Sequence, residues 1–239
     1  MVARRLFSEA VGACIATLVP TVIDIQYYTG AGVEDVSRWL ARGFSVAALI
    51  YALSEISGAH ADPAVSIGFA LRRAMRPWMA ALYVVAQFAG AFAAAALALW
   101  AFGPKELLLG ASHPGPHIAP FFAFAAEIVS TYVLMLIVLM TSQQDEIIGK
   151  QAAIAVGLTV CACGFVAGPI SGASMNPART IAPLILAGSY ANIWVYALGP
   201  VIGAALAVPT QWLLSGSPTP QQRKAAGGKS AVTNFRQQR

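Results

Sequence analysis

The chain has 239 residues, of which 58% are hydrophobic and only 10% are charged. Soluble domains carry about 25% charged residues, so this composition excludes an ordinary soluble protein and indicates one that lies in a membrane. The formal net charge is +5, but the basic residues are spread along the chain, so no nucleic-acid partner is expected.

Six apolar segments follow one another, each long enough to cross a bilayer as a helix. A hydrocarbon core of about 30 Å needs roughly 20 apolar helical residues. From Ser215 the chain is polar and basic, and we expect residues 215–239 to form a disordered cytoplasmic tail. The segments are about 6–28, 40–57, 78–102, 119–141, 150–167 and 190–214.

Two shorter apolar stretches, 62–73 and 176–187, lie between these segments. Each has about 12 residues, or roughly 18 Å of helix, which is about half of a membrane. Each begins with an Asx-Pro pair. Asp or Asn is a good helix cap, and Pro is favoured in the first helical position. The sequence therefore predicts two half-helices that begin at the bilayer midplane.

The two stretches belong to an internal repeat, because SGAHADPAV at 57–65 matches SGASMNPAR at 171–179. Residues about 6–102 and about 119–214 are then two copies of one unit, which contains two spans, a half-helix and a third span. A unit of three spans ends on the opposite side of the membrane, so the second copy must be inverted. The half-helices then enter from opposite faces and meet at their N-termini.

We therefore expect an all-α membrane protein with six transmembrane helices and two half-helices in an inverted repeat. Residues 1–214 would form one channel domain. Six spans place both termini on one side, and eleven of the fifteen Lys and Arg residues would lie there. Basic residues gather on the cytoplasmic side, so both termini are expected to be cytoplasmic in a multi-pass protein of the plasma membrane.

Unwound backbone at membrane depth is tolerated only where it lines a cavity or is buried in protein. The loops before the two half-helices would present backbone carbonyls to such a cavity. The two positive helix ends converge on one point, where they would repel cations and protons while water hydrogen-bonds to the carbonyls and capping groups.

These motifs resemble those of the aquaporin and glycerol-facilitator family, also called the major intrinsic proteins, over residues 6–214. The resemblance implies a passive channel with a pore in each subunit of a homotetramer, for water or small uncharged solutes such as glycerol, urea or metalloid acids. It implies no cofactor, no metal and no enzymatic activity. The residues that carry it are Asp62, Pro63, Ala64, Asn176, Pro177, Ala178, Arg179, Glu9, Glu127, Gln87 and the sequence WVYALGPVIGAALA at 194–207.

The resemblance also implies roles for single residues. Asn176 would cap its half-helix and offer an amide donor to a passing molecule, and Arg179 would narrow the outer pore and oppose cations. Glu9 and Glu127 would accept hydrogen bonds from the unwound loops. His60 would be a structural residue near the cytoplasmic vestibule.

The filter departs from the family pattern. Its four positions fall, by spacing, at Arg42, Gly164, Ala173 and Arg179. Water-selective relatives usually place Phe, His and a small residue beside the Arg, and glycerol-type relatives use Trp, Gly and Phe. Arg42 would either point into the pore, giving a doubly cationic, narrowed or plugged filter, or extend to the extracellular water and leave an unusually wide one.

The second departure is Asp62, where the family has Asn. An ionised carboxylate only accepts hydrogen bonds, whereas an amide both donates and accepts. Asp62 would either weaken the cation barrier or act as a tolerated cap that leaves selectivity unchanged. It is also the one candidate for ion coupling if the chain is a proton- or ion-coupled secondary transporter. A third possibility is a non-conducting homologue closed by Arg42.

Overall fold

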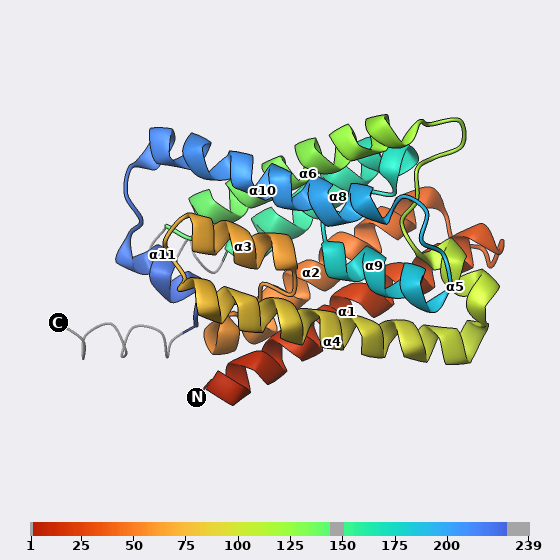
Figure 1. Ribbon diagram of the computed structural model, residues 1–239, viewed down its shortest axis with the longest axis horizontal. Coiled ribbons are helices and arrows are strands. Elements are labelled where there is room, and N and C mark those ends of the chain that lie inside the picture. The colour runs from red at the N-terminus through yellow and green to blue at the C-terminus, as the bar shows by residue number, and fades with distance from the viewer. Residues whose placement is uncertain (1, 144–150, 229–239) are drawn as a thin grey trace.

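The computed structural model describes residues 2–143 and 151–228, and every regular element in these ranges is a helix (Figure 1). Six of the described helices are long and apolar enough to cross a membrane. They are α1 (Val2–Tyr28), α2 (Asp35–Ser57), α4 (Pro77–Phe102), α6 (Pro120–Thr141), α8 (Ala152–Ser171) and α10 (Ile193–Ser215). The shorter ones are α3 (Pro63–Leu71), α5 (Pro104–Gly110), α9 (Pro177–Leu186) and α11 (Pro220–Ala225).

The half-helices α3 and α9 lie in the middle of the bundle, with their N-termini toward each other (Figure 1). The side-chain amide of Asn176, the cap of α9, donates to the carbonyl oxygen of Ala61 at 2.9 Å. Ala61 directly precedes Asp62, the cap of α3. The two tips therefore meet, and the predicted arrangement of six spans and two half-helices is the one observed.

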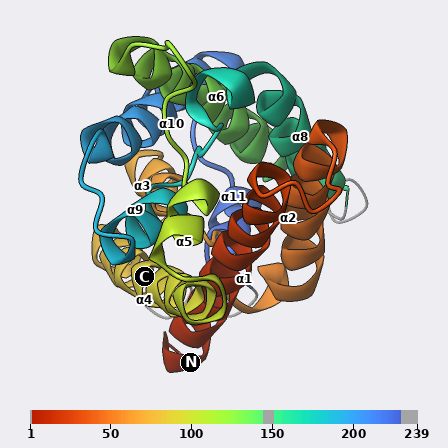
Figure 2. The same ribbon diagram turned by 90° about the vertical axis from the view of Figure 1, so that its right-hand side faces the viewer.

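Close helix crossings hold each half of the bundle together. α1 packs against α4 and α6 against α10, and the two crossings occur at Gly90 and Gly203. A Cβ at Gly90 would lie 1.9 Å from the carbonyl oxygen of Ala10, and one at Gly203 would lie 2.3 Å from that of Ile128. Only glycine lets these backbones approach so closely. Viewed from the end of the bundle, the half-helices lie between α4 and α10 (Figure 2).

The C-terminal segment, residues 216–228, differs from the sequence prediction of disorder. Thr219 caps α11 by accepting from the backbone N–H of Gln222 at 3.2 Å. Gln222 is fully buried, and its amide donates to the carbonyl oxygen of Leu139 at the end of α6. A cap and one buried hydrogen bond thus order a segment whose composition is polar. Residues 229–239 of the predicted tail lie outside the described residues.

Candidate functional site

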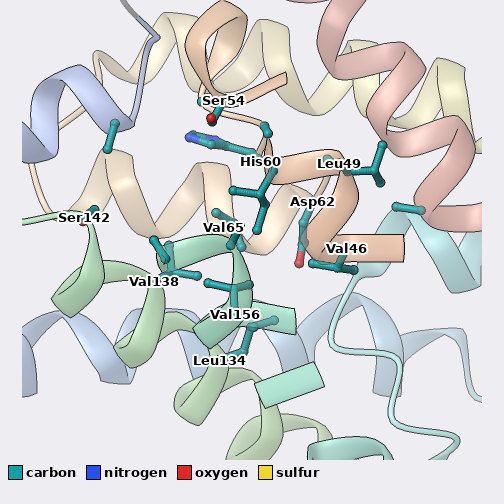
Figure 3. A pocket seen from close by; sticks show the side chains of 18 of the residues that line it. Val46, Leu49, Ser54, His60, Asp62, Val65, Leu134, Val138, Ser142 and Val156 are labelled. Carbon is teal, nitrogen blue, oxygen red and sulfur yellow. The ribbon is translucent and has the colours of Figure 1, made fainter. Parts of the chain in front are cut away.

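A cavity of about 920 Å³ passes the meeting point of the half-helices. Its lining begins at Arg42 and Arg179, continues past Asp62 and Asn176, and ends at the C-terminal segment. Figure 3 shows His60 and Asp62 facing this space. Much of the remaining wall is apolar and includes Val46, Leu49, Val65, Leu134, Val138 and Val156.

The loops that lead into the half-helices have a backbone that residues with a side chain adopt rarely. Ala59 and Ala61 each have φ of 52°, and Ala173 and Met175 have φ of 43° and 55°. Each such residue costs on the order of 1 kcal/mol, so the surrounding structure must hold it in place. The repeat shows the same alternation in both loops, which supports equivalent roles for them.

Two buried carboxylates hold these loops in place. Glu9 on α1 accepts the backbone N–H groups of His60 at 3.1 Å and Ala61 at 2.8 Å. Glu127 on α6 accepts those of Ser174 at 2.9 Å and Met175 at 2.7 Å. These are the contacts that the sequence analysis expects of Glu9 and Glu127.

Further side chains brace the same loops, and the sequence analysis did not identify two of them. Tyr83 donates its hydroxyl to the carbonyl oxygen of Ser57 at 2.7 Å, and Tyr196 donates to that of Ser171 at 2.8 Å. The two tyrosines occupy equivalent places in the repeat, so extending the repeat outward from the motifs is the signal that could have found them. Gln87 donates to Glu9 at 2.7 Å.

His60 lies in the wall of the cavity and is held on several sides. Its Nδ1 lies 2.9 Å from the Ser66 hydroxyl oxygen, and its ring stacks on Phe69 with centroids 4.8 Å apart. The edge of its ring also meets Tyr83 at 5.3 Å. These contacts favour the structural role that the sequence analysis expects.

The six motif residues lie at the meeting point. Asp62 accepts the backbone N–H of Ala64 at 2.8 Å, and Asn176 accepts that of Arg179 at 3.2 Å, so both act as helix caps. Pro63 and Pro177 occupy the first helical turn, where the missing N–H costs nothing. Ala64 and Ala178 are fully buried, and their small side chains allow close packing around the tips.

Arg42 does not take the second of its two expected orientations, the one toward the extracellular water. Its side chain is 5% exposed and lines the outer end of the cavity beside Arg179, so it does not extend to the extracellular water. It donates to the carbonyl oxygen of Gly172 at 2.9 Å and forms an ion pair with Asp24. Arg179 also pairs with Asp24, at 3.0 Å, and donates to the Ser112 hydroxyl.

The other two positions expected in the filter differ from each other. Ala173 lines the cavity, whereas Gly164 is not part of the described lining. A Cβ at Gly164 would lie 2.6 Å from the Trp39 ring, and one at Gly168 would lie 2.1 Å from it. The space that the glycine leaves is therefore filled by the fully buried indole of Trp39, which the sequence analysis did not identify.

Comparison with known proteins agrees with this geometry. The major intrinsic protein family matches residues 2–210. Aquaporin NIP2-3 of Zea mays is 36% identical over 202 residues, which is 84% of this chain and 66% of that protein. Aquaporin NIP1-3 of Oryza sativa subsp. japonica is 37% identical over 205 residues, 84% of this chain and 70% of that protein. The aquaglyceroporin structure from Plasmodium falciparum shares the fold, with a TM-score of 0.77 over 87% of this chain and 95% of that one at 23% identity.

Proposed function

Because the chain belongs to the major intrinsic protein family of passive membrane channels, we propose that it conducts water and small uncharged solutes such as glycerol, urea or metalloid acids. Each subunit would contain one pore. The observation that carries this proposal is the contact between Asn176 and Ala61 in the wall of a cavity that extends to both sides of it.

The electrostatics at that contact favour uncharged solutes. Two half-helices direct their positive ends at one point, and Arg179 adds a guanidinium one turn into α9. A cation that entered would lose its water shell and meet this positive potential. Water and small hydroxylated solutes avoid that penalty because they carry no net charge.

The wall also offers a passing solute replacements for its hydrogen bonds with water. Arg42 and Arg179 supply donors at the outer end, and Asp62 supplies an acceptor at the middle. The apolar side chains opposite them give a small solute no further partners and so limit how tightly it binds. A site that binds weakly at several points allows fast passage.

Osmotic measurements on the full chain in proteoliposomes test the proposal. We expect shrinkage against an impermeant osmolyte, and swelling with glycerol or urea, to be faster than in protein-free vesicles. The rate should rise linearly with the solute gradient and be the same with and without a proton gradient. Rates equal to those of empty vesicles would refute a channel, and a rate that depends on the proton gradient would indicate a coupled transporter.

A matched pair of variants links the flux to the cavity. Val46 lines the cavity, whereas Val129 is 61% exposed on the outer surface of α6. Val46→Trp should stop most of the flux by filling the pore, and Val129→Trp should leave it unchanged. Equal flux in both variants would mean that solutes do not pass through this cavity.

The same proposal includes the assembly and its orientation. We expect four copies to associate in the plasma membrane with both termini in the cytoplasm, which the distribution of Lys and Arg supports. The start of α1 and α11 lie at the same end of the bundle, consistent with that topology (Figure 1). The mass of the detergent-solubilised complex and labelling of single cysteines placed at each end would test these two points.

A further inference from the structure

Asp24 lies near the end of α1, where it meets arginines from two other helices. It is 3% exposed. Its Oδ2 accepts from Arg42 on α2 and from Arg179 on α9, the latter at 3.0 Å. Its Oδ1 lies 3.3 Å from Nε of Arg38. One carboxylate therefore pairs with three guanidiniums.

The carboxylate lies behind the two filter arginines as seen from the cavity. Arg42 and Arg179 line the cavity, but Asp24 does not. Since a single oxygen of Asp24 accepts from both guanidiniums, it holds them side by side against α1. The cavity lining also includes residues of α6 and α8, such as Leu134 and Val160.

Without Asp24 the two guanidiniums would remain buried and adjacent, with no negative group between them. Buried charges that lose their partner are strongly destabilised, and like charges at close range repel. Arg179 would keep its contact with Ser112, and the Arg42 guanidinium would keep its place over the Trp39 ring and its hydrogen bond to the carbonyl of Gly172. Gly172 belongs to the unwound loop before α9, so this contact holds Arg42 close to the pore without drawing it toward α1.

We propose that Asp24 is a positioning residue of the filter, which keeps Arg42 beside Arg179 and away from the path of the solute. This inference rests on the proposed channel function. With Asp24 in place, the outer opening presents two held guanidiniums and admits uncharged solutes with several oxygen acceptors, of the polyol and metalloid-acid class. When Asp24 is lost, Arg42 moves into the opening, and solutes larger than water are excluded first.

The test compares glycerol and water permeability in proteoliposomes, both normalised to the amount of inserted protein. Asp24→Asn should lower the ratio of glycerol to water permeability by about tenfold, the low end of the discrimination that one small steric change in a binding pocket produces. Asp35→Asn is the matched control, because Asp35 is half-exposed and pairs only with the outer side of Arg38, at 3.5 Å. It should leave the ratio unchanged.

A second comparison separates positioning from a general structural role. In an Arg42→Ala background there is no guanidinium to hold away from the path, so adding Asp24→Asn should change the ratio less than about twofold. A purely structural Asp24 would lower both permeabilities equally and would do so in either background, which would overturn the proposal.

The comparison remains decisive if Asp24→Asn alone fails to insert. The double variant should then insert as well as Arg42→Ala does. A double variant that also fails to insert would refute the proposal. Failure of the proposed function itself would be distinct, because the unaltered chain would then conduct neither solute.

Discussion

Replacing Glu127 by Gln should weaken the loop before α9, because this carboxylate accepts three hydrogen bonds there. One oxygen accepts from the Ser171 hydroxyl at 2.6 Å and the Ser174 N–H at 2.9 Å, and the other accepts from the Met175 N–H at 2.7 Å. Glu127 is fully buried. An amide has one oxygen, so its NH₂ group must face at least one of these donors.

The less costly orientation of the amide leaves the Met175 N–H without an acceptor. A buried unsatisfied donor costs about 1–3 kcal/mol, and the two remaining bonds lose the strength that the charge gives them. Together these effects amount to about 3 kcal/mol of unfolding free energy. For a chain of this size that corresponds to a fall in melting temperature of about 6–12 °C.

Thermal unfolding in detergent and water permeability in proteoliposomes would measure the two consequences. We expect the flux per inserted channel to fall as well, because Asn176 directly follows the loop that Glu127 holds. Glu34→Gln is the control, since Glu34 is exposed at the start of α2 and its side chain makes no capping bond. A Glu127→Gln variant with the melting temperature and flux of the unaltered chain would refute this account of the loop.

Three further changes have expected outcomes. Asp62→Asn keeps an oxygen that can cap α3, so water permeability should be equal or higher and ion leak lower; equal proton conductance in both forms would count against a role of Asp62 in ion exclusion. Gly203→Ala places a Cβ against the Ile128 carbonyl and should cost about 1–3 kcal/mol in detergent unfolding, whereas Leu206→Ala on the lipid side of α10 should cost less. Removing residues 219–239 takes away the part of the cavity lining that Pro220, Lys224 and Gly228 contribute, and it should raise water permeability. An unchanged rate would mean that this segment does not limit flow.

The elements that could be predicted from the sequence depend on local signals. Span length, the Asx-Pro caps and the repeated Ser-Gly-Ala lead-ins each act within a few residues, so the six spans and both half-helices agree with the structure. The family resemblance predicted that Glu9 and Glu127 accept hydrogen bonds from the loops, and the two residues lie at equivalent places in the two copies.

The arrangement at the expected filter positions could not be predicted in the same way, because its geometry depends on contacts between helices. Arg42 pairs with Asp24, which lies eighteen residues earlier on another helix, and no local pattern connects the two. The order of the C-terminal segment could not be predicted from the local sequence either. Its polar composition favours disorder, but hydrogen bonds from Gln222 to the Leu139 carbonyl and from Arg72 to the Gly216 carbonyl hold it against the bundle.

The packing of Trp39 over Gly164 and Gly168 affects how such channels can be compared. Aligning four filter positions assumes that the side chain at each position borders the solute. Here a tryptophan one turn before Arg42 takes up the volume beside one of those positions without bordering the cavity. Enlarging this opening by design would therefore start with a smaller residue at position 39. A ranking of relatives by pore size would have to include the turn of α2 that carries Trp39.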